Sequence, residues 1–155
     1  LVGSEMCIRD RYMPAPIKFE AGTQRVSQAV AFAAAVRYLQ HLGMENVEAW
    51  EHELGARLVE GVQKIEGVRL LGPTDPTKRA GLVALAIEGV HPHDVGQLLD
   101  TQGIAVRVGH HCAQPLHRCA GVTASTRAST YIYNTTEDVD AFLKALAEVR
   151  PYFGF

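Results

Sequence analysis

The chain has 155 residues, 47% of them hydrophobic and 21% charged, with a formal net charge of −2. This length fits one domain with a sizeable core, and the hydrophobic content argues against disorder. Because 15 basic residues are balanced by 17 acidic ones, the charge does not favour nucleic-acid binding. No apolar run approaches the ~20 residues of a membrane span. Three cysteines, Cys7, Cys112 and Cys119, form no disulfide framework, so we expect a soluble cytoplasmic protein.

The first twelve residues, LVGSEMCIRDRY, follow neither a helical nor a strand period. They resemble translated adapter sequence, and we interpret residues 1–12 as a non-native leader; a frayed native terminus is the alternative. Under either interpretation Cys7 carries no function. The domain is therefore expected to span residues 13–155, with further native sequence missing on its N-terminal side.

Helices are predicted first along the chain. Residues 24–42 are apolar on most faces, which predicts a buried helix that stops at Gly43. Residues 47–65 carry apolar side chains every three or four positions, which predicts an amphipathic helix with Gly67 at its C-cap.

Strands and shorter helices follow. Short β-rich runs predict strands at 68–71, 82–87, 104–108 and 126–133, and a helix is expected at 92–100. A final amphipathic helix should begin at Thr135 or Thr136, one of which serves as N-cap. The order ααββαββα indicates an α+β fold, in which helices cover one face of a small sheet.

The densest reactive cluster is residues 107–115, Arg-Val-Gly-His-His-Cys-Ala-Gln-Pro. Three interpretations compete: a zinc site, a buried structural cysteine, and a nucleophilic cysteine. The zinc ligands would be His110, His111, Cys112, His117 and Cys119. Structural zinc sites usually pair ligands at closer spacing, and a polar loop is an unusual place for a buried thiol. Basic neighbours would favour the reactive thiolate of Cys112.

Two further features suit anionic groups. Arg127 opens a strand of small and β-branched residues, where its planar fork can pair with a carboxylate, although an ordinary structural ion pair is the alternative. Gly22 and Thr23 stand just before the first helix, where free N–H groups and a hydroxyl suit a phosphate. Simple N-capping by Thr23 is the alternative there.

Taken together, three runs resemble the C-terminal part of SufS-type cysteine desulfurases, which are pyridoxal-phosphate enzymes of the class V aminotransferase family. The runs are Lys-Phe-Glu-Ala-Gly-Thr at 18–23, the segment 103–116, and Arg-Ala-Ser at 127–129 followed by Tyr-Asn-Thr at 133–135. The resemblance implies the small C-terminal domain of a fold-type I enzyme. That domain has a short, mostly antiparallel sheet covered by helices and a long N-terminal helix.

The resemblance also implies residue roles. Cys112 would attack the substrate sulfur and become a persulfide, and His110 and His111 would support it. Arg127 would grip the substrate carboxylate, with Arg107 as a helper. No metal is implied.

At the other end of the chain, the resemblance implies that Gly22 and Thr23 reach the phosphate of pyridoxal 5′-phosphate in the partner subunit, and hence a homodimer. The residue after Thr23 is Gln24, where the family commonly has proline. The family holds the cofactor through a Schiff-base lysine next to a histidine, and no lysine here has that context. The four lysines are Lys18, Lys64, Lys78 and Lys144. We therefore expect a fragment that lacks the large catalytic domain and is inactive alone.

The implied reaction converts L-cysteine to L-alanine and an enzyme persulfide, which supplies sulfur to iron–sulfur cluster assembly through an acceptor protein. Selenocysteine lyase activity of the same family is a close alternative. A stand-alone sulfur-carrier or thiol-redox module, and a zinc-binding interaction domain, are alternatives from other classes.

Overall fold

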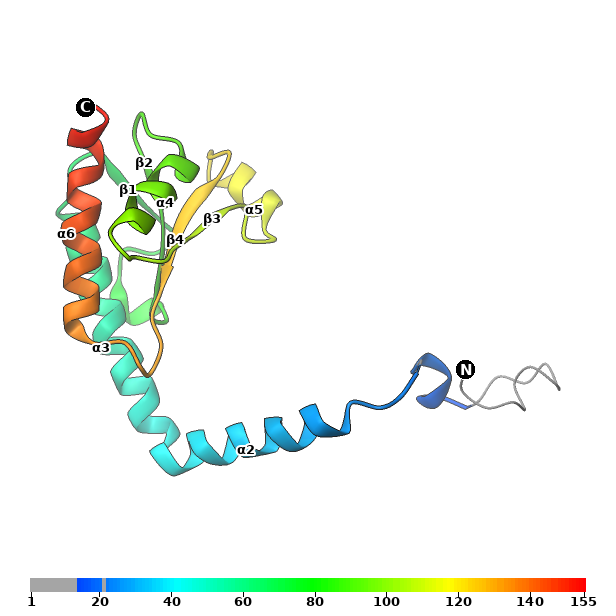
Figure 1. The fold of residues 1–155 in the computed structure, drawn as a ribbon. Coiled ribbons are helices and arrows are strands. Elements are labelled where there is room, and N and C mark those ends of the chain that lie inside the picture. Colours follow the sequence, from blue (N-terminus) through cyan, green and yellow to red (C-terminus); the bar gives the residue numbers. More distant parts are fainter. Residues whose placement is uncertain (1–13, 21) are drawn as a thin grey trace. The chain divides into compact units, whose positions relative to one another are not determined.

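The computed structural model describes residues 14–20 and 22–155, so the predicted leader at 1–12 lies outside the described residues. The chain divides into two compact units, the first ending at Leu42 and the second running from Gly43 to Phe155. The described part of the first unit holds the 3₁₀ helix η1 (Ile17–Phe19) and the helix α2 (Val26–Leu42) (Figure 1). In the part of the chain that the structure describes, no helix is long and apolar enough to cross a membrane.

The second unit contains the remaining elements, which are all labelled in Figure 1 except the short η2. In chain order they are α3 (Met44–Gln63), β1 (Val68–Leu71), η2 (Pro76–Lys78), β2 (Leu82–Ile87), α4 (Pro92–Thr101), β3 (Arg107–Gly109), α5 (Gln114–Cys119), β4 (Ser125–Ser129) and α6 (Thr136–Tyr152).

The four strands form one sheet in the order β1-β2-β4-β3, and every neighbouring pair is antiparallel. In β2, Val83, Leu85 and Ile87 are buried, whereas the alternate residues are less so. Because side chains of a strand alternate between faces, one face of the sheet meets the core. The predicted fold class, an α+β layer with a small antiparallel sheet, is confirmed.

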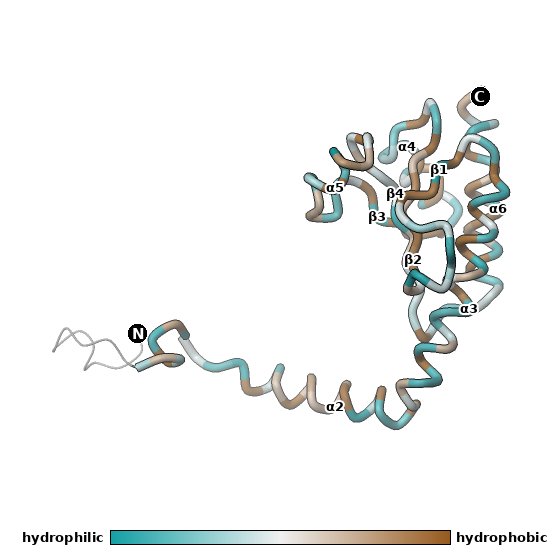
Figure 2. Tube along the Cα trace, turned by 180° about the vertical axis from the view of Figure 1, so that it is seen from behind, coloured by the Kyte–Doolittle hydropathy of each residue, from teal (hydrophilic) through white to brown (hydrophobic). Residues whose placement is uncertain are grey.

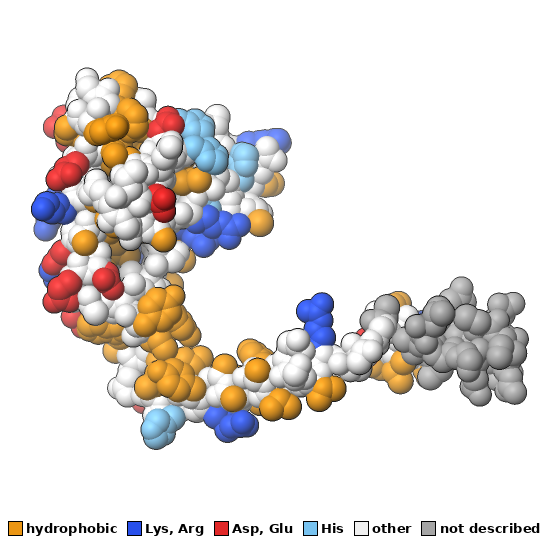
Figure 3. Space-filling view, in the orientation of Figure 1, with side chains coloured by type: hydrophobic (Ala, Val, Ile, Leu, Met, Phe, Trp, Pro, Cys, Tyr) orange, Lys and Arg blue, Asp and Glu red, His pale blue; other side chains and the backbone are white. Residues whose placement is uncertain are grey.

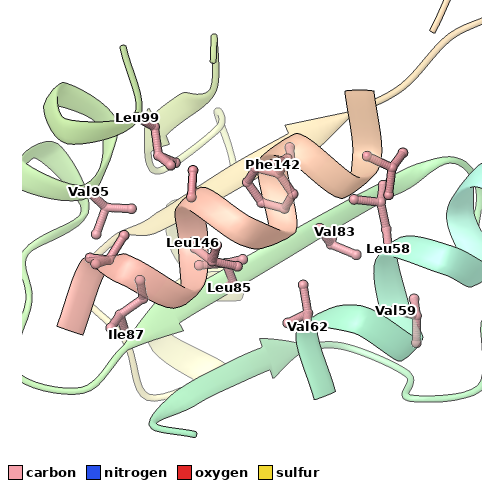
Figure 4. Packing of buried hydrophobic residues seen from close by; sticks show 14 of the residues in the cluster. Leu58, Val59, Val62, Val83, Leu85, Ile87, Val95, Leu99, Phe142 and Leu146 are labelled. Carbon is pink, nitrogen blue, oxygen red and sulfur yellow. The ribbon is translucent and has the colours of Figure 1, made fainter. Parts of the chain in front are cut away.

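The core lies between this face of the sheet and helices α3, α4 and α6. Figure 4 shows buried side chains of the three helices gathered over β2, among them Leu58 of α3, Leu99 of α4 and Leu146 of α6. Apolar residues recur every three or four positions in α3 and α6, so each helix presents one buried stripe to the sheet. The opposite face of the sheet remains available for a site.

Helix α2 differs from its prediction in environment rather than in type. The helix forms and ends just before Gly43, as predicted, but none of its residues is buried. Val30 and Phe32 are 64% and 72% exposed, and Figures 2 and 3 show hydrophobic residues along its length and at its surface. The prediction of a buried helix is therefore wrong for the described residues. An apolar pattern predicts an apolar environment but does not say which segment supplies it.

Two predicted strands are shorter than expected. Residues 104–106 are irregular and only 107–109 form β3, because Ile104 and Val106 pack against the core without pairing in the sheet. Likewise β4 ends at Ser129, where the N–H of Thr130 donates to Gly81 and a turn through Asn134 follows. An apolar run in the sequence predicts that its side chains are buried. Whether the run also pairs in a sheet depends on a neighbouring strand, which a local pattern does not identify.

The C-terminal end of α3 also departs from its prediction. The helix ends at Gln63 and is capped by Lys64, so Gly67 is not its C-cap. Gly67 instead has φ +73° in the turn before β1, and a Cβ there would lie 2.2 Å from the Arg150 guanidinium. The positive φ favours glycine at this position, whereas the Arg150 guanidinium is the end of a flexible side chain that can move.

Helix α6 begins as predicted at a threonine cap. The Thr135 hydroxyl accepts the Asp138 N–H, and the Asp138 carboxylate accepts the Thr135 N–H, which completes a capping box. We expect Thr135→Ala to lower the free energy of unfolding by about 1 kcal/mol, because one orphan N–H of the first turn loses its acceptor. Urea titration of both proteins checks this. A loss for Thr135→Ser as large as for alanine would contradict the capping role, because serine keeps the hydroxyl.

Candidate functional site

Strand β4 places two functional side chains on the face of the sheet that is turned away from the core. Thr126 and Ala128 are buried, so Ser125 and Arg127 project from the other face. In the register, Arg127 lies between Ala84 of β2 and Arg107 of β3. The register of β3 with β4 thus brings together Arg107 and Arg127, the two arginines predicted to bind a carboxylate.

A cavity of about 250 Å³ lies over this face, closed on one side by α5. Its walls are mostly apolar, and Arg127, Ser125, His111 and His117 supply the polar groups. Two of these groups have a buried nitrogen without a hydrogen-bond partner among the described residues, namely Arg127 at Nε and His111 at Nδ1. Buried polar atoms are rarely left unpaired, which marks the cavity as a candidate binding site.

Arg127 makes no ion pair with any carboxylate of the described residues. The alternative of an ordinary structural ion pair therefore has no partner in that part of the chain. Arg107, its register partner, is exposed and carries the same charge. Like charges directly opposite on a sheet repel, so an anionic ligand between the guanidiniums would relieve this cost. Figure 3 shows basic and histidine side chains at the surface around α5.

Cys112 stands on the loop between β3 and α5. Its side chain is exposed and its thiol is free, so the interpretation as a buried structural cysteine is wrong. His111 and Cys112 both have positive φ, at 51° and 60°. Two consecutive non-glycine residues in this region are unusual and store strain, which is typical of functional loops. Cys119, at the end of α5, is also exposed and free.

Three side chains tie this loop to the sheet. His111 Nε2 lies 3.0 Å and His117 Nε2 lies 2.9 Å from the Ser125 hydroxyl, and His117 Nδ1 lies 2.9 Å from the Ala113 carbonyl oxygen. The His110 ring makes an edge contact with His117 at 5.8 Å between centroids. The structure therefore places His110 and His111, the predicted supporting histidines, against His117 of α5. From the sequence, His117 is predicted only as a candidate zinc ligand, and Ser125 has no predicted role.

Electrostatics favour a neutral His111. Burial lowers the pKa of His111 below its ordinary value, and Arg127, His117 and Arg107 lower it further. The unfolded chain therefore binds a proton at this site more readily than the folded chain. The resulting stability is complete above about pH 6.5 and is lost as the pH falls toward the folded value.

This linkage predicts that wild-type protein loses more free energy of unfolding between about pH 7.5 and about pH 5.5 than His111→Gln does. Glutamine cannot titrate, and all other ionisable groups are shared. Urea titrations at the two pH values measure the difference. Equal losses in the two proteins would show that His111 is not held neutral by folding.

The zinc interpretation finds no support in residues 14–20 and 22–155. No group of three or more His, Cys, Asp or Glu side chains there is arranged to hold a metal ion.

Gly22 and Thr23 lie in the first unit and precede α2, which begins at Val26 rather than Gln24. Thr23 makes no hydrogen bond to another described residue, so capping by its side chain is not observed there. Both residues are exposed and Gly22 has φ +80°. Their role toward a cofactor phosphate stays a prediction.

Comparison with known proteins identifies the wider relationship. A model of the family described as aminotransferase class-V matches residues 3–142. The chain is 50% identical over 143 residues to probable cysteine desulfurase 2 of Mycobacterium leprae, a match that covers 92% of this chain and 34% of that protein. It is 48% identical to a probable cysteine desulfurase of Streptomyces coelicolor, again over 34% of that protein. The chain thus spans about a third of the length of these curated relatives.

Solved structures agree with the sequence matches. The apo cysteine desulfurase of Thermococcus onnurineus superposes with a TM-score of 0.81 at 40% identity, covering 88% of this chain and 34% of that one. The Escherichia coli cysteine desulfurase CsdA gives 0.80 at 35% identity, covering 90% and 34%. The resemblance drawn from residues 18–23, 103–116 and 127–129 is confirmed at the level of the family. The chain belongs to the aminotransferase class-V family.

Proposed function

We propose that this chain is the C-terminal part of a cysteine desulfurase of the SufS type, in which Cys112 receives the substrate sulfur. One observation carries the proposal. Arg127, whose buried Nε has no hydrogen-bond partner in residues 14–20 and 22–155, lines the cavity together with both neighbours of Cys112. The chemistry of the cavity therefore suits a small substrate that presents a carboxylate to the guanidinium and a sulfur to the thiolate.

The two arginines bind and orient the substrate. Arg127 donates to the carboxylate as a planar fork within the apolar cavity, where charge-assisted bonds are strong. Arg107 lies opposite on β3 and is exposed, so it adds attraction at the rim. Apolar walls of Leu71 and Ala84 exclude water from the bound carboxylate.

Cys112 performs the sulfur transfer. Its thiolate attacks the substrate sulfur, which forms an S–S bond while the substrate C–S bond breaks. The electron pair of that bond leaves with the substrate carbon, which takes up a proton and becomes the methyl group of alanine. An exposed loop position then presents the persulfide to an acceptor protein, and we propose that the acceptor belongs to iron–sulfur cluster assembly.

Pyridoxal 5′-phosphate is the cofactor of this proposal, and when bound it supplies the electron sink for carbanion chemistry at the substrate. The residues present fit its phosphate. The Thr23 hydroxyl and backbone N–H have no partner among the described residues, and Gly22 leaves open space where a Cβ would stand. These are the donors that phosphate takes before a helix. We propose that they reach the phosphate in a second copy of the enzyme, which makes it a homodimer.

The test uses a complete enzyme in which residues 14–155 replace the matching segment of a relative. With L-cysteine and no reductant, we expect one alanine for each sulfur atom bound to the protein. Alanine formed together with free sulfide, but without protein-bound sulfur, would contradict transfer to Cys112. Alanine from L-selenocysteine but none from L-cysteine would identify a selenocysteine lyase instead. Sulfur uptake without alanine would identify a carrier module.

A further inference from the structure

Ser125 and His117 form a buried polar pair that the proposed sulfur transfer does not use. Ser125 is 0% exposed and His117 is 6% exposed. Ser125 bonds to His111, which precedes Cys112, and His117 bonds to Ala113, which follows it. Ser125 and His117 also bond to each other. The loop that carries the thiol is therefore pinned to β4 and α5 at two points, one before and one after the cysteine.

The hydrogen bonds fix the proton positions. The Ala113 carbonyl can only accept, so His117 must carry its proton on Nδ1. With both rings neutral, His117 Nε2 then accepts the Ser125 O–H, and the Ser125 oxygen accepts the His111 Nε2–H. Among arrangements with two neutral rings, this is the only one that satisfies all three bonds. It leaves His111 Nδ1 as an acceptor, and that buried atom has no hydrogen-bond partner in the described part of the chain.

The surroundings of His111 favour its neutral ring. The groups that face His111 are Arg127 from β4, Arg107 from β3 and His117 from α5, and each of them opposes a positive charge on the imidazole. The bare Nδ1 belongs to a residue that lines the Arg127 cavity. Within the described residues, the side chains that line the cavity thus include one unpaired donor nitrogen, on Arg127, and one unpaired acceptor nitrogen, on His111.

We propose that Ser125 and His117 are positioning residues that hold Cys112 in its strained conformation and set His111 as the Nε2–H tautomer. The expected effect on catalysis rests on the proposed sulfur transfer. The hydrogen-bond arrangement does not depend on that transfer. Because His111 and Cys112 both adopt positive φ, the loop would relax once either anchor is lost. The thiol would then spend less time in line with the substrate sulfur.

The first test needs no substrate and no substitution. Long-range ¹H–¹⁵N correlation spectra of the 155-residue chain, recorded near pH 7.5, distinguish the two neutral tautomers of each histidine. We expect His117 as the Nδ1–H form and His111 as the Nε2–H form. His91 is an internal reference for the Nε2–H form, because its Nδ1 accepts the His93 N–H. An Nε2–H form of His117 would overturn the proposal whatever the enzyme activity.

The second test compares Ser125→Ala with Ser125→Thr in the complete enzyme. Alanine removes the hydroxyl that serves both rings, whereas threonine keeps it. We expect Ser125→Ala to lower kcat for persulfide formation roughly ten- to a hundredfold with KM changed less than about twofold, and Ser125→Thr to restore most of kcat.

Equal kcat in Ser125→Ala and wild type would overturn the positioning role, as would a rise in KM alone. Circular dichroism establishes that each variant is folded. If Ser125→Ala does not fold, the tautomer of His117 and the kcat of Ser125→Thr test the positioning role instead. An enzyme that forms no persulfide in any variant, with the expected tautomers present, would refute the proposed function but not the hydrogen-bond arrangement.

Discussion

Replacing Cys112 by serine is expected to abolish sulfur transfer from cysteine in the complete enzyme while leaving cofactor binding intact. A serine hydroxyl is far less ionised than a thiol near neutral pH, and an oxygen cannot form a persulfide. Because Cys112 is exposed, the exchange of sulfur for oxygen leaves no cavity in the core. Protein-bound sulfane sulfur after a single turnover is the measurement, and we expect a loss to background.

Cys119→Ser is the matched control, because Cys119 is also exposed and free but lies at the end of α5, outside the strained loop. We expect this variant to keep wild-type sulfur transfer. Iodoacetamide labelling of the folded chain should modify Cys112 faster than Cys119. The opposite order, together with a loss of transfer in Cys119→Ser, would mean that the nucleophile is misassigned.

Arg127→Ala is expected to weaken substrate capture by on the order of 2–4 kcal/mol, measured as the ratio of kcat/KM, because a desolvated carboxylate loses a bidentate partner. Arg127→Lys should recover little of this loss, since an ammonium cannot reproduce the planar fork. Steady-state alanine formation over a range of cysteine concentrations gives the ratio for each variant.

Arg107→Ala is the control on the neighbouring strand. Its side chain is exposed, so solvent screens its charge and we expect a smaller effect, mainly on KM. If both Arg127 variants keep the wild-type kcat/KM, Arg127 has a structural role. If Arg107→Ala lowers kcat/KM more than Arg127→Ala does, Arg107 is the main carboxylate-binding residue and Arg127 the helper.

The features that sequence predicted well are those set by residues close together in the chain. The start of α6 follows from Thr135 and Asp138, which satisfy each other's N–H groups. Strands β1 and β2 have the residues predicted for them, because short β-rich runs are bounded by turn residues there. The family resemblance likewise rested on contiguous motifs around Cys112 and Arg127.

Features that depend on distant partners were missed. The six-residue helix α5 begins at Gln114, within the stretch after the predicted strand 104–108 where the sequence predicts only a loop. The bond from His117 to Ser125 exists only because α5 folds back over β4. One available signal was the strand period, since Ser125 and Arg127 are two residues apart and so share a face. No pattern in the sequence supplies the partner of His117.

Locating the transferred sulfur tests most directly whether Cys112 accepts the sulfur while Arg127 holds the carboxylate. After one turnover with L-cysteine, the complete enzyme is alkylated, digested without reductant and mapped by peptide mass spectrometry. We expect one additional sulfur atom on the peptide that contains Cys112 and none on the peptide that contains Cys119. Additional sulfur on Cys119, or alanine formed with no sulfur on either cysteine, would contradict it.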